Sequence, residues 1–185
     1  WDWLDLDTAR DTIDKGRVEF AKYMETYDFR GLMDALEFLK MSGGIDRDGA
    51  RRLERGLFLP ALAEITDYRM DILCRQTTIT ITALVGGIAY GNAPLTAFAV
   101  ASPFGYYSLR RWGATSDGIC HGHGYAQSHY ALNLLLMAEI MARCGLDTFD
   151  SDLKRVVDGS FWWSEPMNPA AASDLCTIAA GHWPD

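Results

Sequence analysis

Three of the four histidines lie within nine residues of one another, at His121, His123 and His129. An imidazole changes its charge near neutral pH and can serve as a base, an acid or a metal ligand. Glycines within the same stretch would let the backbone approach a ligand closely. Three interpretations stay open: a catalytic or substrate-binding loop, a zinc site that includes Cys120, and a polar loop whose histidines only cap helices. The spacing matches no known zinc-finger pattern.

Arginines and aromatic residues accompany the histidines. Arg75 and Gln76 open one expected helix, and Arg110 and Arg111 close another. A guanidinium group presents a fork of donors that matches a carboxylate or a sulfate. Aromatic rings beside such cations could stack on sugars, and the candidates are Tyr106, Tyr107, Trp112, Tyr125 and Tyr130. Equally, the arginines could form a solvated helix end and the rings could belong to the core.

Helices must position these side chains, because apolar residues recur at helical spacing along most of the chain. We expect helices over 1–41, from Asp46 as N-cap through residue 65, and over 95–101, 105–112 and 126–143. Residues 77–82 alternate threonine with apolar residues, which is typical of a strand. We predict a helix there, because the segment continues into a long apolar run that burial would hold helical.

Helix pairs joined by Gly/Asp turns indicate stacked α-hairpins. The sequence therefore predicts an all-α fold in a single domain over 1–185. Residues 113–124 are expected to form a glycine-rich loop. The tail from about residue 159 carries two tryptophans and two prolines and is expected to be irregular.

Composition excludes several classes of protein. With 185 residues and 49% apolar residues, the chain can form a packed core. Its formal net charge of −8 argues against a general nucleic-acid-binding surface, although a local basic patch could still hold an anion. No apolar run reaches the roughly 20 residues that span a bilayer, so no membrane association is expected. No signal peptide is visible at Trp1, which indicates a mature product or a fragment.

Several runs together resemble the heparinase II/III-like and alginate-lyase-like polysaccharide lyases. They are Ser42-Gly43-Gly44-Ile45-Asp46 with residues 51–61, then residues 68–72 followed by Gln76, then Pro103-Phe104-Gly105-Tyr106 through Asp117-Gly118, and finally Tyr130-Ala131-Leu132 with Met137-Ala138-Glu139. These runs occur in the family's order over roughly residues 28 to 160, and their colinearity is a stronger signal than any one of them.

The resemblance implies an incomplete (α/α) toroid of antiparallel helical hairpins with a groove for an acidic polysaccharide. It also implies cleavage of a uronate-containing glycan by β-elimination, without a metal or cofactor. In that reaction one group neutralises the uronate carboxylate, a base removes the C5 proton, and an acid protonates the leaving oxygen. The family implies a secreted or periplasmic location and a further β-sandwich domain, which this chain lacks. The chain would then be a fragment, a trimmed relative or a non-catalytic descendant.

Site residues follow from the same resemblance. Tyr130, Tyr125 or His129 would transfer protons, and Gln76 with Arg75 would neutralise the carboxylate. The groove would be lined by His121, His123, Gln127, Tyr106 and Arg110, with either histidine as an alternative base. The chain departs from the family where Cys74 replaces an asparagine and where Gln127 stands in place of the usual tyrosine. Two alternatives stay open: a non-catalytic carbohydrate-binding remnant, and a metal-dependent hydrolase using His121, His123 and His129.

Overall fold

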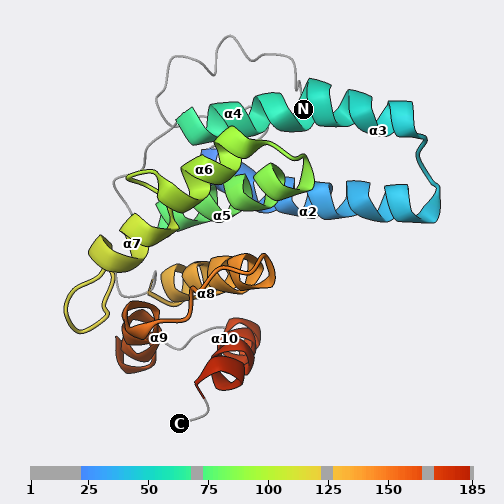
Figure 1. Cartoon of the computed structure of the whole chain (residues 1–185). Helices are drawn as coiled ribbons and strands as arrows, with labels where there is room; N and C mark the ends of the chain where they lie inside the picture. Colours follow the sequence, from blue (N-terminus) through green and yellow to red (C-terminus); the bar gives the residue numbers. More distant parts are fainter. Residues whose placement is uncertain (1–21, 68–72, 122–126, 164–168, 184–185) are drawn as a thin grey trace. The chain divides into compact units, whose positions relative to one another are not determined.

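The computed structural model describes residues 22–67, 73–121, 127–163 and 169–183, and this part of the chain is helical (Figure 1). The helices are α2 Lys22–Ser42, α3 Arg47–Leu53, the π-helix η1 Glu54–Phe58, α4 Leu59–Asp67, α5 Leu73–Ala89, α6 Ala93–Ala101, α7 Tyr106–Trp112, α8 Gln127–Arg143, α9 Ser151–Trp163 and α10 Pro169–His182. Over these ranges the only β pairing is an isolated bridge between Ala114 and Cys120. The all-α prediction is confirmed. No helix of the described ranges is long and apolar enough to cross a membrane.

Contacts divide the chain into two compact units. Unit 1 comprises residues 1–69 and 82–97, and unit 2 comprises residues 70–81 and 98–185. Helices α5 and α6 therefore each contribute residues to both units. The expected single domain over 1–185 stays a prediction.

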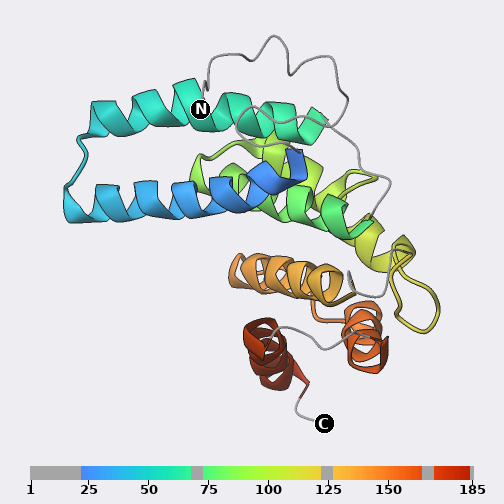
Figure 2. The same ribbon diagram turned by 180° about the vertical axis from the view of Figure 1, so that it is seen from behind.

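In unit 1, α2 and the run from α3 to α4 form an antiparallel hairpin (Figures 1 and 2). Its turn follows Ser42, where Gly43 takes a positive φ of 71°, and the expected stop signal is confirmed. Asp46 then caps α3 as predicted, because its Oδ1 accepts a 2.6 Å hydrogen bond from the Gly49 amide. Buried apolar residues of α2 and α4 form the core of this hairpin: Phe29, Met33, Leu36, Ala61, Leu62 and Ile65.

Pro60 shapes the middle of that run without ending it. Proline has no amide hydrogen, and its ring crowds the carbonyl four residues earlier, at Gly56. Just before Pro60 the helix widens to π geometry over η1, and the Leu59 amide bonds to the Glu54 carbonyl. The wider turn gives the proline room, so α3, η1 and α4 follow one another without an intervening loop.

Helix α5 resolves the conflict over residues 77–82 in favour of a helix, as predicted. Its threonines at 77, 78, 80 and 82 are buried, so their hydroxyls need partners. Thr80 Oγ1 lies 2.9 Å from the Gln76 carbonyl oxygen and 2.8 Å from that of Phe104. Asn133 of α8 donates to the hydroxyls of Thr77 and Thr78 at 3.2 Å each. Tertiary burial and satisfied hydroxyls thus outweigh the β propensity.

Unit 2 is organised around α8, which packs against both α9 and α10. The expectation of an irregular tail from about residue 159 was wrong, since α9 runs to Trp163 and α10 fills Pro169–His182. Asp150 begins α9 by accepting hydrogen bonds from the amides of Asp152 and Leu153 at 3.1 Å. Pro169 is the first residue of α10, a position that favours proline. We expected this proline to mark irregular structure, whereas it begins a helix.

Candidate functional site

The loop between α7 and α8 is a tight, hydrogen-bonded structure over residues 113–121. The Thr115 amide donates to the Ile119 carbonyl at 2.8 Å, and the His121 amide donates to the Gly113 carbonyl at 3.1 Å. Gly118 turns the chain with a φ of 82°. An added Cβ at Gly118 would lie 1.9 Å from the Arg155 carbonyl oxygen, so α9 packs directly against the turn. Residues 113–121 of the glycine-rich loop are therefore packed against α9 within unit 2.

Gln127, the first residue of α8, forms hydrogen bonds with the backbone of this loop. Its side chain is fully buried. Its Oε1 accepts a 2.6 Å hydrogen bond from the Cys120 amide, and its Nε2 donates to the Gly118 carbonyl at 2.9 Å. The side-chain amide of Gln127 therefore bonds to both sides of the turn. A glutamate could not replace it, because a carboxylate has no hydrogen to donate to the Gly118 carbonyl. The predicted groove residue is thus buried and positions the loop backbone.

Tyr130 is also buried, with no exposed surface. Its hydroxyl donates a 2.5 Å hydrogen bond to the Leu109 carbonyl of α7. Burial raises the pKa of this phenol far above its ordinary value of 10. The hydroxyl joins α8 to α7 and is shielded from any substrate in this structure, so Tyr130 supports the loop as Gln127 does.

Three exposed residues at the end of α7 and in the loop that follows it are here called the loop edge: Arg111, Trp112 and His121. Trp112 ends α7 and is 69% exposed. The Arg111 guanidinium carbon lies 4.8 Å from the centroid of the Trp112 ring. The hydrogen bond between the His121 amide and the Gly113 carbonyl brings exposed His121 beside the end of α7. The loop edge thus offers an exposed indole ring, a guanidinium group and an imidazole.

His129 lies in the first turn of α8 and is exposed, between the buried side chains of Ser128 and Tyr130. The predicted residues His123 and Tyr125 lie outside the described residues. Among the residues that the structure describes, no three histidine, cysteine or acidic side chains gather as a metal site would require. The zinc alternative needs His123 and stays untested.

Tyr106 and Arg110, expected to contact substrate, make internal contacts. Tyr106 is fully buried and its hydroxyl donates to the Thr148 carbonyl at 2.9 Å. Burial raises the pKa of Tyr106, partly opposed by the nearby Arg110 charge. Arg110 Nη1 lies 2.6 Å from Asp150 Oδ2, and its guanidinium stacks 5.2 Å from the Tyr107 ring centroid. These residues tie α7 to the segment that begins α9.

The predicted carboxylate-neutralising pair lies at the start of α5. Gln76 is fully buried, and its Nε2 lies 3.5 Å from Thr80 Oγ1. Arg75 is half-buried. The side chain of Cys74 lies outside the described residues. A buried amide cannot reach a polysaccharide without movement of the helix, so this part of the predicted site finds no support in the geometry.

Two features were missed as sites from the sequence. Arg111 and Trp112 were named only as possible contributors, and their sequence signal is an arginine followed by an aromatic at a helix end. The second feature is a set of arginines spaced at three and four residues over 47–55. The first could have been found from this residue pair, and the second from the spacing of the arginines. Comparison of the chain with protein-family models, with curated proteins and with solved structures gives no match.

Proposed function

We propose that this chain acts on a uronate-containing acidic polysaccharide by β-elimination, as part of an incomplete (α/α) toroid of antiparallel helical hairpins. The observation that carries the proposal is the loop edge, where exposed Trp112, Arg111 and His121 lie at one end of α7. The family resemblance adds the toroid, the secreted location and the further β-sandwich domain to the proposal.

The loop edge suits the chemistry of a sugar acid. An indole ring offers an apolar face on which a sugar ring stacks. The Arg111 guanidinium beside it can pair with the uronate carboxylate and offset the charge that develops when C5 loses its proton. An imidazole removes that proton, the electron pair forms the C4–C5 double bond, and the C4–O bond breaks. The leaving oxygen then receives a proton from a general acid.

Proton transfer falls to the exposed imidazoles in this account. His121 and His129 are exposed, whereas the hydroxyl of Tyr130 is buried and bonded to a backbone carbonyl. Tyr125 stays a candidate for the acid. Gln127 acts indirectly, because it bonds to the loop that carries His121, whereas Tyr130 joins α8 to α7.

Binding of an acidic glycan without turnover is the second candidate. It is favoured by the burial of Tyr130 and Gln76, which removes two of the expected catalytic side chains from solvent. Such a protein would use Trp112 and Arg111 for recognition and would leave its ligand unchanged.

An ultraviolet screen tests the proposal. Each turnover of a lyase creates an unsaturated uronate that absorbs light, so we expect absorbance to grow with at least one of alginate, heparan, hyaluronan and chondroitin, and to do so in a chelator. Trp112→Ala should lower kcat/KM by about tenfold or more, because a stacking contact is lost. The matched control Phe161→Ala removes a similarly exposed ring, 52% accessible, from α9. Equal effects of the two substitutions would argue against the loop edge, and binding without absorbance would support the second candidate.

A further inference from the structure

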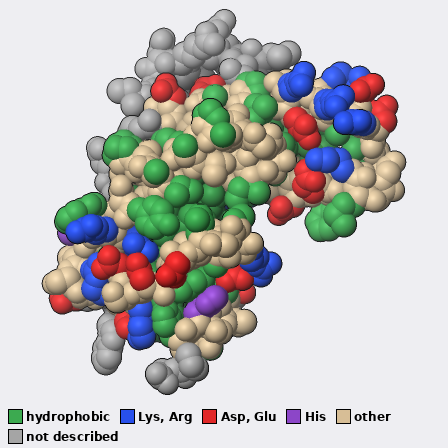
Figure 3. Space-filling model, in the orientation of Figure 1, with side chains coloured by type: hydrophobic (Ala, Val, Ile, Leu, Met, Phe, Trp, Pro, Cys, Tyr) green, Lys and Arg blue, Asp and Glu red, His purple; other side chains and the backbone are tan. Residues whose placement is uncertain are grey.

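Four arginines lie within nine residues of unit 1 although the whole chain carries a net charge of −8. They are Arg47, Arg51 and Arg52 of α3 and Arg55 of η1, here called the arginine face. All four are exposed, and Figure 3 shows basic side chains gathered over α3. No ion pair is formed by any of them in the described part of the chain. Arg47, Arg51 and Arg55 follow one another at intervals of four residues, so they lie along one side of the helix.

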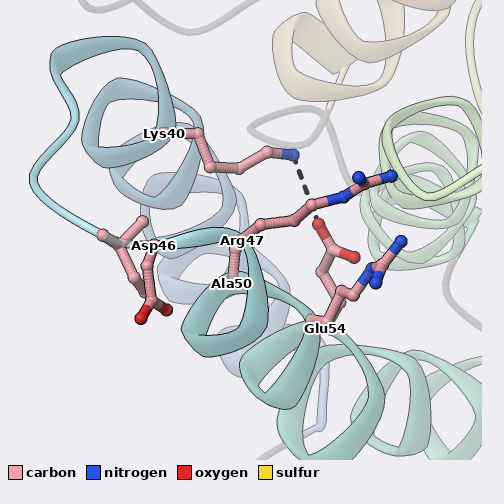
Figure 4. A pocket seen from close by; sticks show the side chains of 7 residues that line it. Lys40, Asp46, Arg47, Ala50 and Glu54 are labelled. Carbon is pink, nitrogen blue, oxygen red and sulfur yellow. Dashed lines mark hydrogen bonds and ion pairs between the residues drawn. The ribbon is translucent and has the colours of Figure 1, made fainter.

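This arrangement costs helix stability, since like charges four residues apart repel one another. Of the neighbouring carboxylates, Asp48 lies among these arginines, and two others are engaged elsewhere. Asp46 Oδ1 is engaged by the Gly49 amide, and Glu54 Oε1 lies 3.2 Å from Lys40 Nζ. Figure 4 shows Lys40 reaching from α2 towards Glu54, with the side chain of Arg47 over the same hollow. The donors of these exposed guanidinium groups are thus accessible to an anion from outside the chain.

Two adjoining hollows give the arginine face a shape that a ligand can enter. One, of about 390 Å³, is lined by the cations Lys40, Arg47 and Arg51 together with the carboxylates Asp46 and Glu54. The other, of about 540 Å³, is lined by Arg51, Arg52 and Arg55 together with Asp48. Arg51 belongs to both. Volumes of this size accommodate small ligands or segments of a polymer. Successive arginines separated by about 6 Å along the helix axis could meet successive anionic groups of an extended chain.

We propose that the arginine face binds the carboxylate or sulfate groups of an extended acidic glycan, at a site separate from the loop edge. Oxyanions fit the guanidinium fork, which donates two parallel hydrogen bonds. The existence of an oxyanion site rests on the arginines alone, whereas the choice of a glycan as the ligand rests on the proposed function.

Nucleic acid is the less favoured ligand. No aromatic side chain lines either hollow, so bases find no stacking platform. Asp48 lies among the arginines of the second hollow, where it would repel a dense row of phosphates more than a chain with sparser charge.

An anionic membrane is also less favoured. The exposed apolar residues Leu53 and Leu57 are each two residues from Arg51 and Arg55, which places them about 200° away around the helix. A bilayer that took up these leucines would turn the arginines away from its headgroups.

Titration calorimetry of the 185-residue chain tests the site. The probes are a galacturonate hexasaccharide and a sulfated hexasaccharide, which separate carboxylate from sulfate recognition. We expect at least one to bind, with an affinity that falls as salt is raised. Arg51→Ala/Arg55→Ala should weaken binding by about tenfold or more, as loss of two charge-assisted contacts predicts.

The matched control is Arg143→Ala/Lys154→Ala, which removes two exposed cations from α8 and α9 in unit 2. We expect this control to retain wild-type affinity. Both variants place alanine in exposed helix, so circular dichroism should show native helicity. Equal loss in the two variants, no binding of either hexasaccharide by the wild type, or tighter binding of single-stranded DNA or phosphatidylserine vesicles overturns the proposal. Failure of the ultraviolet screen alone leaves this site standing, because calorimetry measures binding without turnover.

Discussion

The side chain of Tyr130 is buried in unit 2, and its hydroxyl lies 2.5 Å from the Leu109 carbonyl oxygen. That carbonyl also accepts a hydrogen bond from the Gly113 amide at 2.8 Å, so it keeps one partner if the phenol is lost. A buried hydroxyl with such a contact stabilises the native state, and its raised pKa keeps it protonated. The side chain therefore acts on structure rather than on a substrate.

Tyr130→Phe tests this role. We expect the free energy of unfolding to fall by about 1 kcal/mol, the usual worth of one hydrogen bond, with turnover unchanged. Urea denaturation and the ultraviolet assay measure the two effects. Tyr107→Phe, at a ring 37% exposed on α7, should change neither quantity. Loss of turnover in a Tyr130→Phe variant of native stability would restore Tyr130 as a proton carrier.

The family resemblance led to Tyr130, Gln127 and Gln76 as site residues, and all three are buried. In sequence, a tyrosine or glutamine near a helix start is compatible with either of two roles, contact with a sugar or support of the fold. The same hydrogen-bond donors that bind a sugar also bind buried backbone carbonyls. Only the packing of α7 and α9 against α8 decides between them. By contrast, the exposed histidines His121 and His129 stayed available for chemistry.

At the scale of elements, the turn at Gly118 depends on a residue without a side chain. Its φ of 82° strains other residues, and the Arg155 carbonyl fills the space where a Cβ would lie. Gly118→Ala should therefore destabilise the chain by about 2–4 kcal/mol.

Gly145, which ends α8, is the matched control. Its φ is 85°, yet nothing lies within 4 Å of an added Cβ. Gly145→Ala should cost only about 1 kcal/mol, since strain acts there without a clash. Thermal denaturation of both variants measures the difference. Equal losses would contradict the close packing of α9 against the loop.

The contact between α8 and α10 predicts a pH dependence. Glu139 Oε2 lies 3.0 Å from His182 Nε2, and Oε1 lies 2.9 Å from Arg143 Nη2. The hydrogen bond with His182, followed by that with Arg143, lowers the pKa of Glu139 below its ordinary 4.5. A lowered carboxyl pKa means that this stabilisation is present above about pH 4.5 and is lost as pH falls through the folded-state value.

We expect Glu139→Gln to lower Tm at pH 6 by an amount worth less than about 1 kcal/mol, as for other solvent-facing pairs. The gap between wild type and variant should close as the pH is lowered towards 3. Asp158→Asn, which removes a carboxylate facing Lys154 on α9, serves as the control. A gap that stays constant from pH 6 to pH 3 would show that the Glu139 charge does not contribute.

Most helices could be predicted from periodicity, and α5 could be predicted from the long apolar run that follows its threonines. The α3 cap at Asp46 could be predicted as well. Helix α10 could not, because the stretch that leads into it, with two tryptophans at 162 and 163 and prolines at 166 and 169, is typical of irregular tails. There, burial of Leu175 and the start at Pro169 outweigh local composition. The π-helix η1 could not be predicted either, because the sequence gives no sign of it other than Pro60.

At the scale of the whole molecule, charge is distributed unevenly. The net charge of −8 predicts repulsion of polyanions, yet the four arginines of the arginine face lie together in unit 1. Net charge describes long-range steering, whereas binding depends on local donors. We therefore propose that acidic glycans are recognised by local surfaces, the arginine face in unit 1 and the loop edge in unit 2.

Absorbance of the reaction product tests the central claim most directly. Wild-type chain, His121→Ala, His129→Ala and the double variant are each mixed with the uronate glycan that responds best in the screen. We predict growing absorbance for the wild type and a loss of about 100-fold or more in at least one histidine variant, as removal of a general base requires. Absence of unsaturated product from every uronate glycan, or full turnover by the double variant, would contradict β-elimination at the loop edge.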